Sequence, residues 1–484
     1  MFINSSIRTS GPLGPGFVAI SFMVATIAGT SASNSADIII SAPQTFTETL
    51  TEDSTVTVTN TGSIIVDPGT VAFDSAGFNS ELILFGPVSA STSVAGTDVN
   101  TILQLGSLYN TVTVGQGGDI SANGIAIPDN TYAVQQITAG GVNTVNLENA
   151  TITATSDDVI ARGIEQLVIT NRNVINFGSN ARLSVDGDTG AFGIIQSSVS
   201  GDSDAVFAAG TRLDVSSFAF TTAVQQGSSG SGDLTSVFGD NVHINVKGTG
   251  ATTAVLQTTS SGSASLTFGS GTYIKVIGGN SPGAIRQLSS DNSFILGQNS
   301  IIDVTTGGNQ FGLNQQPRDT FNRNRAVIQA NSRISVVAGL DATGILSTAT
   351  APVTSSLTLE HGVEIFASGD AAFGVDVVAN GFELQNNGGR IIATSTNAIQ
   401  ESYGVRMDGD NNNFINHGTI FADLAPDSHA ILMNGNNNML SMLTYPVTQG
   451  QITFGNGSGT FGTGNTLVMG RGFDAAFTVG ADPA

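Results

Sequence analysis

The sequence predicts an all-β protein built as a parallel β-helix, a three-strand solenoid with about 30 residues per coil. Three observations predict this fold: a regular internal repeat, alternating β-branched residues within each repeat, and a glutamine that returns at one position of seven successive repeats. We expect the right-handed form by precedent.

The repeat is marked by a small residue followed by an aliphatic residue. Successive pairs are separated by 26 to 32 residues, and most separations are 30. A period of this length is typical of stacked supersecondary units, each of which lies on the next. The marking pairs are Ala133-Val134, Gly163-Ile164, Gly193-Ile194, Ala223-Val224, Ala254-Val255, Ala284-Ile285, Gly312-Leu313, Gly344-Ile345, Gly374-Val375, Gly404-Val405 and Ala430-Ile431.

Two further apolar segments follow the pair within each period. Leu266-Thr267-Phe268 is an example of the middle segment, and Leu213-Asp214-Val215 is an example of the last one. Alternation with period two, in β-branched residues bounded by Gly, Asn, Asp and Ser, predicts strands. Three short strands cannot form a core alone, so the next coil must cover their inward residues at a spacing of about 4.8 Å.

A glutamine lies three residues after the small residue in seven successive coils. Period-two alternation places this column on the same inward side as the marking aliphatic residue. We therefore predict a ladder in which each amide donates to the carbonyl oxygen of the glutamine one coil away. The alternative, a row of amides that binds sugar hydroxyls, requires the column to be exposed. The ladder residues are Gln136, Gln166, Gln196, Gln226, Gln257, Gln287 and Gln315.

Composition limits the possible partners. The 484 residues include 15 basic and 37 acidic side chains, which gives a formal charge of −22, and the chain has no cysteine. No basic stripe is available to neutralise a phosphate backbone, so we expect no nucleic acid partner. The missing cysteines exclude a disulfide scaffold, a thiolate nucleophile and a cysteine-ligated metal.

The chain divides into four predicted regions. Residues 1–36 contain a short apolar run followed by small residues, which predicts a signal peptide, with a disordered arm as the alternative. We expect irregular solenoid coils and a cap over residues 37–130, the regular β-helix over 131–455, and a final coil or tail over 456–484. At 30 residues per coil, the chain from residue 37 allows about 15 coils.

No pattern in the sequence predicts a catalytic, cofactor or metal site. Gly201-Asp202-Ser203-Asp204 resembles the Gly-Asp-Ser-Gly element of serine proteases, but Asp204 replaces the second glycine and the segment falls at a predicted turn. The four histidines are expected in turns or at strand ends, without the spacing of a metal pair. They are His243, His361, His417 and His429.

Two acidic groups are the nearest candidates for a β-helical polysaccharide lyase or hydrolase. One is Asp157-Asp158 with Arg162, and the other is Asp408 and Asp410 with Arg406. Because the chain has no tryptophan and few aromatic residues to stack on sugars, a non-enzymatic role is favoured. The turn containing Asp408 and Asp410 is also a candidate calcium site, although Asn and Gly form such turns without a metal.

The units of strand, Asn-x-Gly turn and strand resemble the passenger region of bacterial autotransporters. Residues 414–420, with the sequence FINHGTI, show the unit, and residues 56–66 show the same succession of strand, Asn/Gly turn and strand. The likeness covers roughly residues 37–470. It implies a right-handed β-helix that is exported to the bacterial surface, remains secreted or associated with the outer membrane, and acts as an adhesin or a structural element.

The chain departs from this family because no series of barrel-type strands follows the solenoid. We therefore expect a translocator encoded elsewhere, a fragment of a longer chain, or another export route. The expected partners are ligands on host or neighbouring cells. An alternative is end-to-end assembly into a filament or layer, because open terminal coils present unpaired backbone groups. A second alternative is a polysaccharide-active enzyme.

Overall fold

The computed structural model describes most of the chain from residue 36 onward, and residues 1–35 of the predicted signal peptide lie outside the described residues. The described ranges are 36–45, 47–50, 54–66, 71–76, 79–92, 98–106, 108–124, 130–157, 159–279, 283–317, 323–349, 354–397, 399–423, 428–443, 446–455 and 462–470. Within these ranges, no helix is long and apolar enough to cross a membrane.

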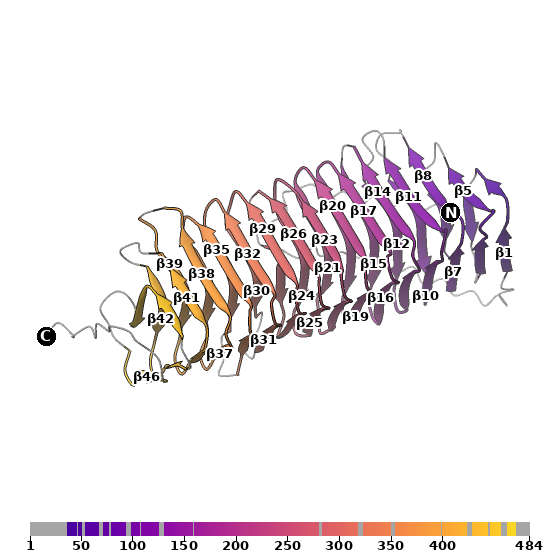
Figure 1. Ribbon diagram of the computed structural model, residues 1–484. Helices are drawn as coiled ribbons and strands as arrows, with labels where there is room; N and C mark the ends of the chain where they lie inside the picture. The colour runs from indigo at the N-terminus through magenta and orange to yellow at the C-terminus, as the bar shows by residue number, and fades with distance from the viewer. Residues whose placement is uncertain are drawn as a thin grey trace. The chain divides into compact units, whose positions relative to one another are not determined.

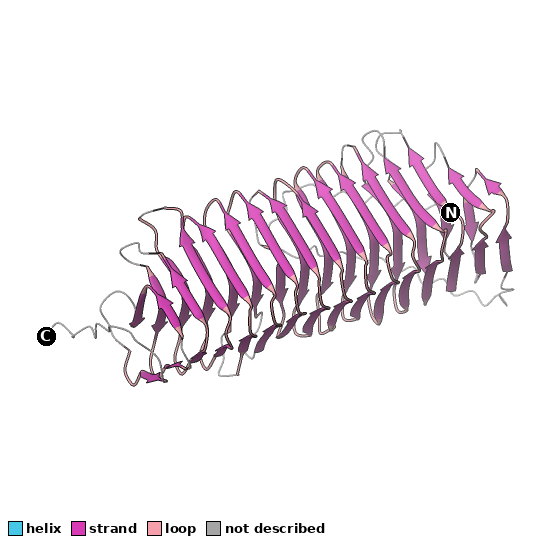
Figure 2. Cartoon of the chain, in the orientation of Figure 1, coloured by secondary structure: helices cyan, strands magenta, loops and turns pink. Residues whose placement is uncertain are grey.

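Strands of the described residues form three parallel sheets, here called sheets A, B and C (Figures 1 and 2). Sheet A has 16 strands. In order they are β1 (Ala36–Ile40), β4 (Ser54–Val58), β7 (Asn79–Leu84), β10 (Tyr109–Val114), β13 (Val142–Leu147), β16 (Arg172–Phe177), β19 (Asp202–Phe207), β22 (Leu234–Phe238), β25 (Ser263–Phe268), β28 (Asp291–Leu296), β31 (Arg323–Ile328), β34 (Ser356–Leu359), β37 (Glu383–Asn386), β40 (Asn413–Asn416), β43 (Met439–Met442) and β46 (Thr466–Met469).

Sheet B has 15 strands and follows sheet A in each coil. Its strands are β2 (Pro43–Gln44), β5 (Ser63–Val66), β8 (Val88–Thr92), β11 (Asp119–Gly124), β14 (Thr151–Ser156), β17 (Arg182–Gly187), β20 (Arg212–Ser217), β23 (His243–Lys247), β26 (Tyr273–Gly278), β29 (Ile301–Thr306), β32 (Arg333–Ala338), β35 (Glu364–Gly369), β38 (Arg390–Ser395), β41 (Thr419–Ala422) and β44 (Val447–Gln449).

Sheet C also has 15 strands, and each of them follows a strand of sheet B along the chain. Its strands are β3 (Glu48–Leu50), β6 (Val71–Ser75), β9 (Val99–Gly106), β12 (Asn130–Thr138), β15 (Ile160–Val168), β18 (Gly190–Ser198), β21 (Phe220–Ser228), β24 (Thr252–Thr259), β27 (Ile285–Leu288), β30 (Gln310–Gln316), β33 (Ala342–Thr348), β36 (Ala372–Val378), β39 (Ser402–Asp408), β42 (His429–Asn434) and β45 (Gln451–Phe454).

The strand order confirms the predicted fold class. Each strand pairs in parallel with the strand three places along the chain, so every coil contributes one strand to each sheet. The marking aliphatic residues lie in one file: Val134 pairs with Ile164, which pairs with Ile194. All three are buried in the hydrophobic core. Each repeat of about thirty residues in the sequence therefore forms one coil of the solenoid.

The small residue before each marking aliphatic has a steric cause. In sheet C the two successive residues Ala133 and Val134 are both buried. At Gly374 an added Cβ would overlap the Ile391 side chain of sheet B and would lie 2.5 Å from the carbonyl oxygen of Gly404 in the next coil. At Gly374 even the methyl group of alanine would overlap these atoms, so this position requires glycine.

The turns from sheet A to sheet B contain a column of left-handed residues. Asparagine or glycine occupies this position in successive coils, and each has a positive φ angle. Glycine has no Cβ to clash there, and asparagine tolerates the conformation better than most residues. The column runs through Asn149, Asn180, Gly210, Asn241, Gly271, Asn299, Asn331 and Gly362.

Phenylalanine rings fill the interior beside sheet A over five coils. Phe207 lies 4.3 Å from Phe238 between ring centroids and the two rings are stacked, while Phe238 lies 4.6 Å from Phe268. Phe177 and Phe294 continue the row at its two ends through a tilted and an edge-on contact, at 5.1 and 6.0 Å. These rings are almost fully buried, so their burial stabilises the stacking of one coil on the next.

Candidate functional site

The predicted glutamines form a continuous buried chain of side-chain hydrogen bonds. Each Nε2 donates to Oε1 of the glutamine one coil earlier, at distances of 2.7 to 2.9 Å. All seven side chains are buried, so their amides are closed to a ligand. The donors are Gln136, Gln166, Gln196, Gln226, Gln257, Gln287 and Gln315.

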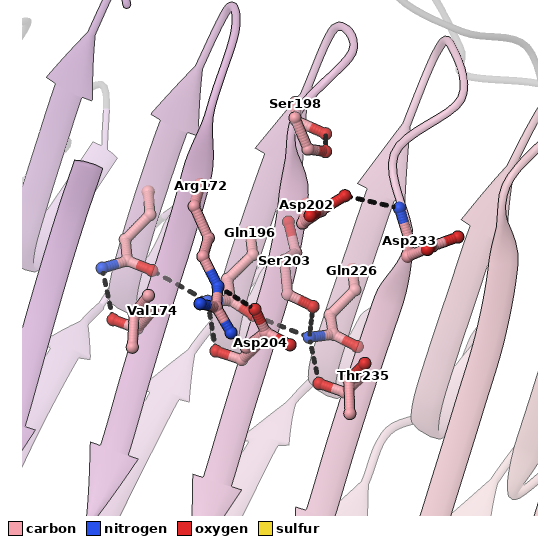
Figure 3. Close-up of polar contacts among 12 residues, drawn as sticks. Arg172, Val174, Gln196, Ser198, Asp202, Ser203, Asp204, Gln226, Asp233 and Thr235 are labelled. Atoms are coloured by element: carbon pink, nitrogen blue, oxygen red, sulfur yellow. Dashed lines mark hydrogen bonds and ion pairs between the residues drawn. The ribbon is translucent and has the colours of Figure 1, made fainter. Parts of the chain in front are cut away.

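The second amide hydrogen of each glutamine is also used. Nε2 of Gln166 donates to the carbonyl oxygen of Val174 at 3.1 Å, and Nε2 of Gln196 donates to that of Asp204 at 3.1 Å. These acceptors belong to the sheet A strand that follows in the same coil. The ladder therefore ties neighbouring coils together and also ties sheet C to sheet A within one coil (Figure 3).

The ladder begins one coil earlier than the sequence predicted. Gln104 accepts the Nε2 hydrogen bond of Gln136 at 2.7 Å and is itself buried. The signal was present in the sequence, because Thr101-Ile102-Leu103-Gln104 has the spacing of the later coils with threonine in place of the small residue. Buried asparagines add a parallel set of bonds, from Asn110 to Asn143 at 3.0 Å and from Asn143 to Asn173 at 3.1 Å.

The protease-like segment has a structural role in joining coils (Figure 3). Ser203 is buried on sheet A, and its backbone carbonyl accepts a hydrogen bond from Nε2 of Gln226 at 3.0 Å. The Asp202 carboxylate accepts the backbone N–H of Asp233, one coil later, at 2.9 Å. Asp204 forms an ion pair with Arg172 of the preceding coil. A buried serine among these bonds is not exposed to a substrate.

A charged and aromatic cluster lies on the outer face of sheet C near the C-terminal coils. Arg406 binds Asp376 through two hydrogen bonds, Nε to Oδ1 at 2.8 Å and Nη2 to Oδ2 at 2.7 Å. Its guanidinium also lies 4.5 Å from the ring centroid of Phe373. The rings of Phe373 and Tyr403 stack at 5.3 Å, and His429 stacks on Tyr403 at 5.5 Å.

Burial controls the ionisation of this cluster. Desolvation raises the pKa of the Asp376 carboxyl above its ordinary value of 3.8, and the hydrogen bonds from Arg406 only partly oppose that shift. A buried carboxyl with a raised pKa is one mark of an acid–base catalyst. Here, however, both carboxylate oxygens are occupied by the Arg406 fork, so the pair is a clamp between adjacent coils.

The candidate calcium turn is held by hydrogen bonds to the next coil. Oδ1 of Asp410 accepts the backbone N–H of Asn436 at 2.6 Å and its side-chain amide at 3.2 Å. Asp408 accepts a hydrogen bond from Asn434 and lies 3.7 Å from Nε of Arg406. Across the described ranges, no three His, Asp or Glu residues are grouped so that they could hold a metal ion.

The other acidic candidate is organised around Arg162 on sheet C. Its Nη1 donates to Oδ1 of Asn130 at 3.0 Å and to the hydroxyl of Tyr132 at 2.6 Å. Its guanidinium lies 4.9 Å from the Tyr132 ring centroid. Burial raises the pKa of Tyr132 well above its ordinary value. Asp157 is exposed at the neighbouring corner, and Asp158 lies outside the described residues.

The remaining histidines are placed on the outside of the coils. His243 begins β23 and is exposed, with its ring centroid 6.1 Å from that of Tyr273 in the next coil. His361 is exposed in the turn before β35, and His417 is half-buried in the turn between β40 and β41. These three lie in different coils.

The outer column of sheet B, which includes Asp214, Asn245, Lys275, Asp303 and Ser335, departs at one coil from the register that the sequence alternation suggests. The alternation Val363-Glu364-Ile365 suggests that Glu364 follows Ser335, but Ser335 pairs with Phe366 and Glu364 pairs with Arg333. Val363 is buried in the turn before β35, so the alternation of apolar residues begins one inward position before the strand itself. Glu364 instead lies 3.3 Å from Arg333 and 3.4 Å from Arg390.

No protein-family model, curated protein or solved structure matches this chain. The class of protein is therefore defined by its fold: a parallel β-solenoid of three sheets with about 30 residues per coil.

Proposed function

We propose that the protein is a non-enzymatic surface scaffold, similar to an autotransporter passenger, that binds ligands along the outside of its coils. The observation that carries this proposal is the engagement of the candidate catalytic groups. Arg406 is bound to Asp376, Asp410 to Asn436, and Arg162 to Asn130. These groups and the buried ladder join one coil to the next. The other outward-facing side chains of the three sheets therefore remain for binding a ligand.

Export and adhesion complete this proposal. Residues 1–36 act as the signal peptide, a separately encoded translocator places the chain at the bacterial surface, and the partners are ligands on host or neighbouring cells. The net charge of −22 favours solubility and disfavours attraction to anionic membranes. The resemblance of the repeat to autotransporter passengers supports this assignment.

The proposal is tested by adding protease to intact producing cells and by binding the purified full chain to cell surfaces. We expect surface cleavage of the chain and saturable binding. In parallel, acidic polysaccharides are incubated with the wild type and with the variant Asp408→Asn/Asp410→Asn. Turnover by the wild type that is lost in the variant would overturn the non-enzymatic assignment, and a chain protected inside intact cells would overturn the surface assignment.

A second candidate function is end-to-end assembly into a filament or surface layer. Among the described strands, β1 and β46 are the outermost members of sheet A, and each pairs on one side only. Inward apolar residues of the terminal coils are only partly buried, namely Ile38, Ile452, Phe454 and Leu467. An exposed sheet edge with an open apolar interior can accept another chain.

Electron microscopy of the purified chain over a range of concentrations tests the filament. Rods that lengthen in steps of one molecule as concentration rises would support end-to-end assembly. Rods of one length at all concentrations would eliminate it and leave the scaffold as the proposed function.

A further inference from the structure

Two phenylalanine rings stand out on a corner of the solenoid that is otherwise small and polar. Phe218 lies between β20 of sheet B and β21 of sheet C, and Phe220 is the first residue of β21; their exposed fractions are 72% and 55%. The same corner consists of Asp188-Thr189 one coil earlier, and of Gly248-Thr249-Gly250-Ala251 one coil later. No large side chain of these two corners flanks the rings along the solenoid axis.

Backbone bonds fix the position of these corners relative to one another. The N–H of Phe218 donates to the carbonyl oxygen of Asp188 at 2.8 Å, and the N–H of Gly250 donates to that of Ala219 at 2.9 Å. Phe220 pairs with Gly190 in the sheet C register. These backbone bonds hold the corner that contains the two rings between two corners of smaller residues.

These rings differ from those of the cluster at Arg406. In the cluster at Arg406, the rings of Phe373, Tyr403 and His429 cover one another, and the guanidinium covers Phe373. Among the described residues, Phe218 and Phe220 make no such ring contact. Their flat faces are thus available to a ligand, which the faces of the Arg406 cluster are not.

The surroundings of the rings define the chemistry of the ligand. Asp188 lies at the same corner one coil earlier, and Asp186 ends the outer column beside it, where it accepts a hydrogen bond from Ser216 at 2.7 Å. Carboxylates accept hydrogen bonds from hydroxyl groups and repel phosphates, sulfates and other carboxylates. A pyranose ring combines an apolar face of C–H groups with hydroxyl donors at its rim.

The size of the patch argues against a second copy of the chain as the occupant. Two phenylalanine side chains can bury about 300–500 Å². A stable protein interface needs about 800 Å² on each partner. A ligand of one or two sugar rings matches the available apolar area.

We propose that Phe218 and Phe220 form a stacking platform for a neutral sugar, with Asp186 and Asp188 accepting hydrogen bonds from its hydroxyls. The proposal rests on the surface-scaffold function and names a ligand class for it. It predicts that the axial C–H face of the sugar contacts the rings and that acidic sugars bind more weakly.

The test uses the full chain and neutral hexaoses of glucose and mannose, with oligogalacturonate as the acidic comparison. Saturation-transfer NMR identifies the sugar protons that contact the protein, and calorimetry gives the affinity. We expect saturation on the axial ring protons and at least about tenfold weaker binding by Phe218→Ser/Phe220→Ser. Phe218→Tyr/Phe220→Tyr should retain binding. The control Val337→Ser changes another exposed apolar side chain, on sheet B, and should leave the affinity unchanged.

The outcomes separate this inference from the proposed function. If none of the neutral hexaoses binds, or if the double serine variant binds as well as the wild type, the platform is overturned. Cell-surface binding that persists in the same double variant would leave the scaffold function standing. If sedimentation shows that the double serine substitution converts a dimer to a monomer, the occupant is a second copy and the sugar assignment is wrong.

Discussion

The buried glutamines show how single residues hold this solenoid together. Each side chain uses both amide hydrogens, and each of them before Gln315 also accepts a hydrogen bond from the glutamine of the next coil, so no amide of the ladder is left without a partner. Burial makes these bonds costly to break, because an unsatisfied polar group in the interior costs about 1–3 kcal/mol. The ladder also fixes register, since a coil that slipped by one residue would bury an unpaired amide.

Replacing one ladder residue should therefore destabilise the protein strongly. Gln226→Leu keeps a similar volume but removes the acceptor for Nε2 of Gln257 and the donor for Oε1 of Gln196. We expect a loss of about 2–4 kcal/mol in the free energy of unfolding. The matched control Gln225→Leu alters the neighbouring outward side chain and should change stability little. Denaturant unfolding of the two variants checks this, and equal midpoints would contradict it.

The Asp376–Arg406 pair gives a prediction about pH. The folded-state pKa of Asp376 is raised above 3.8 by burial. The folded state therefore binds this proton more tightly than the unfolded state, and the contribution of Asp376 to stability is lost as pH rises through the folded pKa. The stability of the wild type relative to Asp376→Asn should be greater at about pH 3 than at about pH 7. A difference that is independent of pH, or that grows with pH, would contradict the assignment.

At the level of strands and turns, the steric demands of the interior explain the marking pair of each repeat. The small residue exists because sheet C buries two successive residues against sheet B, and this cause becomes visible only when the sheets are in place. The asparagine and glycine column in the turns has a separate cause, the left-handed backbone. In the sequence, both features are visible only as residue types that recur at fixed positions. In the structure, both are required by the geometry of the coil.

Enlarging the small residue should disrupt the packing of sheet B on sheet C. Gly374→Val would force atoms into the space of Ile391 and the Gly404 carbonyl, so we expect a loss of about 2–4 kcal/mol in stability. Gly307→Ala is the matched control, because an added Cβ meets no atom within 4 Å there. Thermal unfolding of both variants provides the measurement. A Gly374→Val variant as stable as Gly307→Ala would refute the steric explanation.

The turn column predicts an order among substitutions at one position. Asn331 has a φ angle of 57°, and glycine holds the equivalent position in the next coil at Gly362. Asn331→Gly should be nearly neutral, whereas Asn331→Val should cost about 1–3 kcal/mol because a β-branched residue is strained at positive φ. Denaturant unfolding of the two variants decides the order, and the reverse order would contradict the turn assignment.

The sequence predicted the features that repeat and did not predict those that depend on contacts between unlike coils. Regular spacing was enough to predict the sheets, the inner file from Val134 and the position of the glutamines. Gln104 was overlooked because threonine replaces the small residue that marked the other coils. The Arg406 cluster could not be foreseen, because Asp376, Arg406 and His429 come from three successive coils whose register had to be known first.

For the whole solenoid, stability is expected to arise from neighbour-to-neighbour contacts. Each strand pairs only with the strands one coil before and one coil after it, so long-range order is built from repeated local steps. The ladder, the phenylalanine stack and the turn column all run along this same direction. The proposed binding function depends on the outward side chains, because the interior is filled by buried side chains.

The stacking of coils is tested most directly by distances between spin labels on the outer column of sheet B. The chain has no cysteine, so pairs of cysteines can be introduced at Ser121 together with Asp303, Ser335 or Phe366, which are six, seven and eight coils away. Pulsed electron paramagnetic resonance should give distances near 29, 34 and 38 Å, increasing by about 4.8 Å per coil. Distances that do not increase by this constant step would contradict the solenoid and the account built on it.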